Sequence, residues 1–140
     1  MKDDVKLAHE IAKRAHHGQV DKAGVPYILH PETVASLVTK DDEKIVAYLH
    51  DVIEDTSYRL SDLEEAGFSS EIIKAVDLLT RKDGQSYNQY LKLVKTNELA
   101  RVVKLADLKH NSDLSRLAQV TRNDIKRLKK YQDAIIFLST

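Results

Sequence analysis

Apolar residues recur at intervals of three and four along most of this chain, the spacing that places them on one face of an α-helix. The first such segment spans residues 4–17 and ends before Gly18, a residue type that often follows a helix. Its apolar positions are Val5, Leu7, Ala8, Ile11, Ala12 and Ala15. The strict alternation typical of half-buried strands is nearly absent. The pattern therefore predicts an all-α protein.

The pattern is interrupted over residues 18–30, where two glycines and a proline predict an ordered loop. Pro31 suits the first turn of a second helix, because that turn does not need its missing N–H. We expect this helix to end at Val38 and a third to run from Asp41 or Asp42 through Ile53. Further helices are predicted over residues 61–66, 70–80, 87–95, 98–114 and 122–138.

Polar residues ahead of several of these segments indicate where the helices begin. Asn97 and Thr121 are typical N-caps, because their side chains can accept a free backbone N–H. The pairs Ser61–Glu64 and Ser86–Gln89 have the spacing of a capping box. No repeat, low-complexity segment or linker is visible. The sequence predicts one helical bundle of seven or eight helices over residues 1–140.

Composition excludes several classes of protein. Among the 140 residues, 22 Lys and Arg balance 22 Asp and Glu, which argues against a nucleic-acid-binding module. There is no Cys, so disulfides, thiol catalysis and Cys-based zinc sites are excluded. No apolar run is long enough to span a membrane, and the first residues lack a signal-peptide pattern. We expect a cytoplasmic protein without nucleic-acid or membrane partners.

Four polar clusters lie in segments that are otherwise patterned for burial. His30 ends the predicted loop, and His50-Asp51 stands among Leu49, Val52 and Ile53. The other two clusters are Glu54-Asp55 and the pair Asp107 and Asn111. A buried Asp is costly unless a partner or a metal neutralises its charge. Spacings of three and four would place His50, Asp51, Glu54 and Asp55 along neighbouring rows of one helix.

Two imidazoles and two carboxylates from three segments form a plausible divalent-metal site. Without thiols, this donor set favours Mn²⁺, Fe²⁺ or Mg²⁺, with Zn²⁺ also possible. Such a metal lowers the pKa of bound water and polarises a phosphoryl oxygen, which suits phosphoester or pyrophosphate hydrolysis. Glu54 or Asp55 could then move a proton or orient the water. The structural alternatives are a metal-free His50-Asp51 core pair, a bracing role for Asp107 and Asn111, and a solvated helix end at Glu54-Asp55.

Three stretches resemble the HD metal-dependent phosphohydrolases, and most closely the hydrolase domain of the Rel/SpoT alarmone enzymes and their small stand-alone relatives. They are residues 24–31 (GVPYILHP), 50–56 (HDVIEDT) and 104–111 (KLADLKHN). The resemblance implies a single HD domain without a synthetase domain, with His30, His50, Asp51 and Asp107 holding one Mn²⁺-like ion. It also implies that Glu54 and Asp55 activate or position the attacking water, and that Asn111 contacts the nucleotide.

The activity implied by the resemblance is removal of the 3′-pyrophosphate from guanosine tetra- or pentaphosphate. One position departs from the family: the Rel/SpoT hydrolases have a basic residue, usually Arg, nine positions before the loop His, and here it is Asp21, followed by Lys22. Candidate substrate contacts are Lys22, Arg81, Lys82, Tyr87 and Lys104 beside Asn111. The structural alternatives are packing for Tyr87 and a solvated face for the basic residues, including the run Lys126, Arg127, Lys129 and Lys130.

Two other functions remain open from the sequence. The same site could act on another nucleotide: an adenosine alarmone, a nucleoside 5′-monophosphate or a triphosphate. Alternatively, the chain could be a weakly catalytic helical module that senses a nucleotide or binds a protein. The intact Glu54-Asp55 pair favours an enzyme with a small-molecule nucleotide substrate.

Overall fold

The computed structural model describes residues 2–140, which form an all-helical bundle. Its α-helices are α1 (Lys2–Ala15), α2 (Leu29–Ser36), α3 (Asp41–Leu49), α4 (Val52–Asp55), α5 (Leu60–Glu65), α6 (Ser70–Leu79), α7 (Tyr87–Lys95), α8 (Glu98–Asn111) and α9 (Arg122–Ser139). A short 3₁₀ helix, η1 (Leu114–Arg116), separates α8 from α9. The only β-type pairing in the described part is an isolated bridge within the loop between α1 and α2. The predicted all-α class is confirmed.

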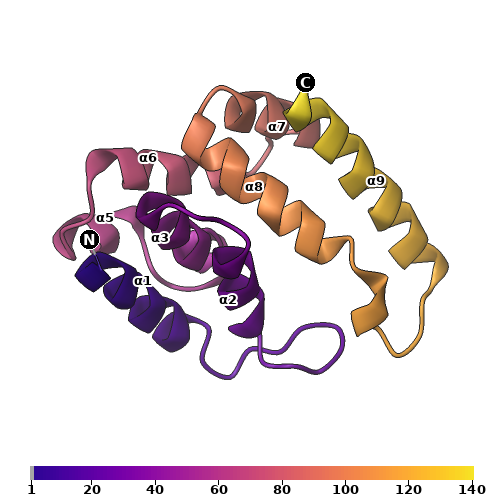
Figure 1. Ribbon diagram of the computed structural model, residues 1–140, viewed down its shortest axis with the longest axis horizontal. Helices are drawn as coiled ribbons and strands as arrows, with labels where there is room; N and C mark the ends of the chain where they lie inside the picture. Colours follow the sequence, from indigo (N-terminus) through magenta and orange to yellow (C-terminus); the bar gives the residue numbers. More distant parts are fainter. Residues whose placement is uncertain (1) are drawn as a thin grey trace.

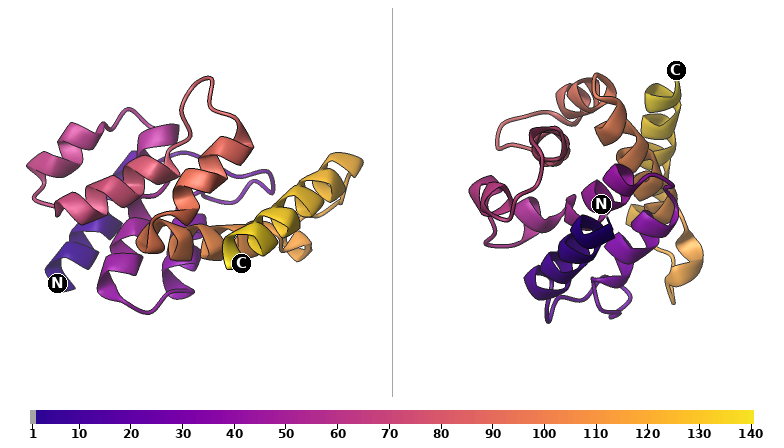
Figure 2. Two further views of the ribbon diagram at one scale, coloured as in Figure 1. Left: turned by 90° about the horizontal axis from the view of Figure 1, so that it is seen from above. Right: turned by 60° about the vertical axis from the view of Figure 1, so that its left-hand side comes forward.

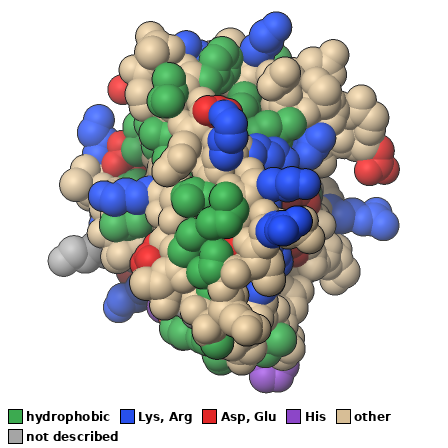
Figure 3. Space-filling model, turned by 90° about the vertical axis from the view of Figure 1, so that its right-hand side faces the viewer, with side chains coloured by type: hydrophobic (Ala, Val, Ile, Leu, Met, Phe, Trp, Pro, Cys, Tyr) green, Lys and Arg blue, Asp and Glu red, His purple; other side chains and the backbone are tan. Residues whose placement is uncertain are grey.

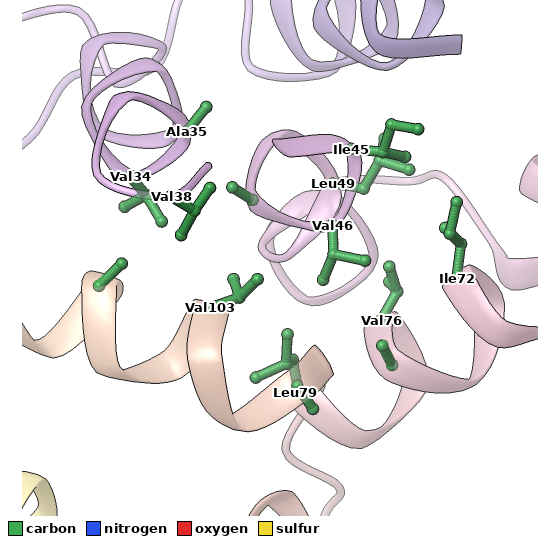
Figure 4. Close-up of a cluster of buried hydrophobic side chains, with 14 of the residues drawn as sticks. Val34, Ala35, Val38, Ile45, Val46, Leu49, Ile72, Val76, Leu79 and Val103 are labelled. Carbon is green, nitrogen blue, oxygen red and sulfur yellow. The ribbon is translucent and has the colours of Figure 1, made fainter. Parts of the chain in front are cut away.

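Helix α3 lies at the centre of the bundle and packs against α1, α2, α6 and α8 (Figure 1). Ile45, Val46 and Leu49 are almost fully buried at these contacts, and Figure 4 shows them facing side chains of the neighbouring helices. Burial of one such side chain contributes about 1.5–3 kcal/mol to folding. The residues that follow Leu49 are therefore held on one of the most firmly packed elements of the protein.

Several predicted helix starts are confirmed by side-chain caps. Ser86 accepts the backbone N–H of Gln89, Asn97 that of Ala100, and Thr121 that of Asp124. The predicted cap at Ser61 is wrong. Helix α5 begins at Leu60, because the Asp62 carboxylate accepts the Arg59 N–H at 2.8 Å and starts the helix earlier.

The prediction of one continuous helix through Ile53 is also wrong. The chain leaves the helical pattern at His50 and Asp51 and resumes it in α4. The His50 ring is the local cause, because its Nδ1 donates to the Ala47 carbonyl at 2.6 Å. In a continuous helix that carbonyl would accept the Asp51 N–H, so the side chain competes with the backbone. The adjacent His-Asp pair therefore occupies a turn between two helices.

Helix α8 ends at Asn111, three residues before the predicted boundary. The Ser112 hydroxyl donates to the Leu108 carbonyl at 2.7 Å, and Asp113 accepts the Ser115 N–H to start η1. Helix α9 then returns beside α8 at one edge of the bundle (Figures 1 and 2). None of the described helices combines the length and apolar character needed to cross a bilayer.

Candidate active site

Four predicted metal ligands from separate segments converge at the centre of the bundle. His30 lies in the first turn of α2, His50 and Asp51 form the turn between α3 and α4, and Asp107 lies on α8. One ligand atom of each lies within 4.8 Å of the others. His30, His50 and Asp107 are buried and Asp51 is partly buried. The structure therefore brings together all four residues of the predicted ligand set.

The histidine rings are oriented by contacts on the side away from this cluster. Because His50 Nδ1 donates to the Ala47 carbonyl, the lone pair of the neutral ring is on Nε2, which lies 3.0 Å from Asp51 Oδ2 and 3.4 Å from Asp107 Oδ1. Nε2 is buried and has no hydrogen-bond partner among the described residues. His30 Nδ1 lies 2.7 Å from His110 Nδ1, so a proton shared there leaves His30 Nε2 facing the cluster.

The two carboxylates are held by polar neighbours. The Tyr27 hydroxyl donates to Asp51 Oδ2. Lys104 Nζ lies 2.9 Å from Asp107 Oδ2, and Asn111 Nδ2 donates to Asp107 Oδ1 at 3.1 Å. Burial alone would raise the pKa of the Asp107 carboxyl, but the Lys104 ammonium together with the His30 and His50 rings outweighs burial and holds that pKa well below its usual range. Asp107 is therefore ionised at neutral pH.

This donor set fits a divalent cation. Burial on its own lowers the pKa of His50, but the Asp51 and Asp107 carboxylates outweigh burial and raise that pKa well above its usual value. The two carboxylates thus favour a positive charge beside Nε2, and a bound cation supplies that charge while leaving the imidazole neutral. Two imidazole nitrogens and two carboxylate oxygens are ligands of borderline and hard metals. These four residues can hold a divalent metal ion.

The predicted catalytic carboxylates lie beside the cluster on α4. Glu54 Oε1 accepts the backbone N–H of Arg81 at 2.8 Å, which fixes its position. The Asp55 carbonyl accepts Gln19 Nε2 at 3.1 Å, so the loop before α2 supports this end of α4. Burial and the nearby charges of Asp51 and Glu54 raise the pKa of the Asp55 carboxyl to about 6. Asp55 can therefore gain and lose a proton near neutral pH.

Two adjoining cavities open at the four-residue cluster. The first, here called the metal cavity, has a volume of about 270 Å³ and is lined by His30, Asp51 and Asp107 of the cluster and by both α4 carboxylates. The second, here called the loop cavity, has a volume of about 350 Å³ and lies between the loop before α2 and the start of α9. The two cavities share Tyr27, His30, Asn111 and Tyr131 as lining residues.

The predicted substrate contacts are distributed unequally between these cavities. Asn111, Lys104, Arg81 and Tyr87 line the metal cavity, and Asn111 and Lys22 line the loop cavity. Lys82 lines neither. Its ammonium instead donates to the Asp77 and Thr80 carbonyls at the end of α6, at 2.6 and 2.7 Å.

Asp21 has a structural role in the loop. Its Oδ1 accepts the backbone N–H groups of Ala23 and Val25 at 2.8 and 3.1 Å, which closes a tight turn. Two cations, Lys22 and Arg127, also line the loop cavity, and both face the buried Asp124. With Asp21 at this position, the loop cavity has two cations, Lys22 and Arg127, beside three carboxylates, those of Asp21, Asp113 and Asp124.

Several residues at the site were not predicted from the sequence. Tyr27 lies inside the motif of residues 24–31. Its partner Asp51 is 24 positions further along the chain, so nothing in the sequence around Tyr27 indicates this contact. Arg127, Lys130 and Tyr131 lie on α9 within a run that the sequence indicated as a solvated face. The sequence does contain an indication of this role. Arg127 and Tyr131 are four residues apart and therefore share one helix face, and that face can point toward the site.

The fold and the site together define the class of protein. An all-helical bundle with an adjacent His-Asp pair, a distant His and a distant Asp around one cavity is the HD-type arrangement that the motifs indicated. No protein-family model matches the chain.

Individual proteins are similar to it. A guanosine-3′,5′-bis(diphosphate) 3′-pyrophosphohydrolase from Haemophilus influenzae is 43% identical over 115 residues, covering 72% of this chain and 17% of the relative. The bifunctional (p)ppGpp synthase/hydrolase SpoT of Escherichia coli K12 is 35% identical over 121 residues, covering 76% of this chain and 17% of the relative. The chain thus spans about one sixth of the length of these relatives.

A solved structure shares the fold. It is described as a metazoan ortholog of SpoT that hydrolyzes ppGpp and plays a role in starvation responses. The match has a TM-score of 0.76 and 22% sequence identity, and covers 96% of this chain and 84% of the other. The resemblance to Rel/SpoT-type hydrolase domains is confirmed by the two sequence relatives, and the HD-type fold by this structure.

Proposed function

We propose that this chain is a metal-dependent phosphohydrolase that removes the 3′-pyrophosphate of guanosine tetra- or pentaphosphate. The observation that carries the proposal is the convergence of His30, His50, Asp51 and Asp107 beside the Glu54-Asp55 pair. Similarity to proteins named as 3′-pyrophosphohydrolases over 72% of the chain supports this substrate. The products are pyrophosphate and GDP or GTP.

The proposed cofactor is one divalent ion, with Mn²⁺ favoured by the mixed nitrogen and oxygen donors. When bound, it would activate water and polarise the phosphoryl group. Tyr27 and Lys104 hold the Asp51 and Asp107 carboxylates in place for it.

Asp55 and Glu54 have different proposed roles. The Asp55 carboxylate accepts a proton from the attacking water. Glu54, fixed by the Arg81 N–H, orients that water. The water oxygen forms a bond to the phosphorus next to the ribose, and the bond from that phosphorus to the 3′-oxygen breaks. The electron pair stays on the 3′-oxygen, which then takes up a proton.

The nucleoside is placed in the loop cavity, because that cavity adjoins the metal cavity and is large enough for a nucleobase and ribose. Asn111 lines both cavities and is positioned to contact the nucleotide between them. Lys22 and Arg127 supply positive charge for phosphates near this end. A second candidate keeps the same chemistry on another nucleotide, and the loop-cavity carboxylates of Asp21 and Asp124 favour testing it.

A direct test uses metal-stripped protein with added Mn²⁺. It is incubated with guanosine tetraphosphate and with a panel of adenosine alarmones, nucleoside 5′-monophosphates and triphosphates, and pyrophosphate and orthophosphate are measured. We expect pyrophosphate and GDP from guanosine tetraphosphate, and none from Asp51→Ala. Activity on another nucleotide alone would replace the substrate assignment. If no nucleotide is hydrolysed, the result would favour the nucleotide-sensing module.

A further inference from the structure

Three cations gather around two tyrosines in the metal cavity, and none of the three lines the loop cavity. Resting on the proposed function, we propose that Arg81, Lys104 and Lys130 bind the terminal phosphate of the 3′-diphosphate. Lys130 is the residue that completes this site, although its sequence context indicated a solvated face. Together they select a diphosphate over a monophosphate at the ribose 3′ position.

The geometry places the cations around the aromatic rings. Lys130 Nζ lies 4.0 Å from the centre of the Tyr87 ring, and Arg81 Cζ lies 5.6 Å from the same centre. Lys104 Nζ lies 5.3 Å from the Tyr90 ring, whose centre is 6.0 Å from that of Tyr87. All five residues line the metal cavity. Three chain segments thus bring positive charge to one end of the cavity.

The positive charge at this end is incompletely neutralised. Lys104 is paired with Asp107, but neither Arg81 nor Lys130 has a carboxylate within 4.0 Å in the described part of the chain. Burial, together with repulsion from Arg81 and Lys104, lowers the pKa of Lys130. The Tyr87 hydroxyl is buried and also has no hydrogen-bond partner among the described residues. An anion in this position would neutralise the cations and could accept the tyrosine proton.

The order of the lining residues along the two cavities indicates which phosphate of the substrate the three cations bind. The two cavities meet at Tyr27, His30, Asn111 and Tyr131, whereas Arg81, Lys104 and Lys130 line only the metal cavity. With the nucleoside in the loop cavity and the reacting phosphorus at the cluster, the next phosphate along the 3′ chain reaches the cations. A 3′-monophosphate has no group to place there.

Helix α9 offers a matched control. Lys126 lies one turn before Lys130 and is exposed, as Lys130 is, but only Lys130 lines the metal cavity. Lys126→Gln removes the same charge from the same helix, so it reports any general electrostatic effect. Figure 3 shows that basic side chains are numerous on the face that α9 presents, which makes this control necessary.

The test compares Lys130→Gln, Lys130→Arg and Lys126→Gln with the natural protein. We expect Lys130→Gln to lower kcat/KM for guanosine tetraphosphate about tenfold, as for loss of one hydrogen bond to a charged group. The inhibition constant of guanosine 5′-diphosphate 3′-monophosphate should change less than about twofold. Lys130→Arg should restore most of the activity and Lys126→Gln should match the natural protein. Equal losses with both nucleotides, or no loss, would overturn the assignment.

A binding measurement separates this inference from the proposed function. Calorimetry with Mn²⁺-loaded protein and inorganic pyrophosphate or orthophosphate needs no turnover. We expect Lys130→Gln to weaken pyrophosphate binding about tenfold and orthophosphate binding little. If the natural protein leaves guanosine tetraphosphate intact, the proposed function fails, and the terminal-phosphate site stands only if this selective loss is observed. Equal binding by Lys130→Gln and Lys126→Gln would refute the site.

Discussion

Tyr27 links the loop before α2 to the candidate metal site through one hydrogen bond. Its hydroxyl donates to Asp51 Oδ2 and thereby orients the carboxylate of one of the four candidate metal ligands. Groups that orient metal ligands typically contribute 10- to 100-fold in affinity, so Tyr27→Phe should weaken Mn²⁺ binding about tenfold. Metal titration followed by calorimetry measures this. Unchanged affinity would show that Asp51 is positioned by the backbone alone.

Asp55 gives a pH-dependent prediction for the metal-stripped protein. Its pKa is about 6 in the folded protein, above the ordinary value of 3.8. The folded state therefore binds the proton more tightly, and Asp55 lowers stability as pH rises from about 4 to about 6. Because this side chain is only partly covered and keeps much of its contact with water, solvent screening reduces the effect to about 1 kcal/mol.

Asp55→Asn should accordingly raise the free energy of unfolding by about 1 kcal/mol at pH 7.5 and by little at pH 4. Denaturant unfolding at the two pH values measures the difference, and turnover of the same variant should be lost. The turnover of Asp55→Asn is compared with that of Glu54→Gln, which should reduce turnover while sparing metal binding. A gain in stability that is the same at both pH values would argue against the raised pKa of Asp55.

At the scale of elements, the start of α9 controls a helix that carries residues of both cavities. Thr121 accepts the Asp124 N–H at 3.2 Å and donates to its carboxylate at 2.9 Å. Thr121→Ala should cost about 1 kcal/mol of stability. It should also raise KM, because Arg127, Lys130 and Tyr131 follow on the same helix.

Ser69→Ala provides the control for this prediction. Ser69 caps α6 by accepting the Ile72 N–H, and it lines neither cavity. The expected loss of stability is similar, but KM should stay constant. Chemical denaturation and steady-state kinetics on both variants distinguish an effect of α9 on KM from an effect of lower overall stability. A KM increase in both variants would contradict a specific role for the start of α9.

The same elements show what the sequence could predict. Helices with clear apolar spacing and side-chain caps, such as those after Ser86 and Asn97, begin where the pattern predicts. The turn at His50 could not be predicted, because it depends on a side chain competing for the Ala47 carbonyl rather than on a helix-breaking residue. The same is true of Tyr27 and Lys130, whose neighbours at the site come from distant segments.

At the scale of the whole molecule, metal binding should stabilise the folded state. The four candidate ligands come from three segments that meet only when α8 has packed against α2 and α3. A ligand that binds only the folded state at about 100 times its Kd adds about 2.7 kcal/mol. We expect Mn²⁺ to raise Tm by several degrees, EDTA to reverse the shift, and Asp51→Ala to abolish it. Identical melting curves with and without metal would contradict the assigned ligand set.

The separation of the ligands along the chain also sets an order of events during synthesis. His30 and Asp107 lie in contact although 77 positions separate them, and α8 must be complete before they can meet. Contacts this distant in sequence form late, after the cost of closing the intervening chain has been overcome. The metal therefore cannot guide the early steps of folding. A nascent chain could therefore hold an ion at these four residues only after α8 has packed against α2 and α3, whereas α9 supplies none of them and could still be unfolded.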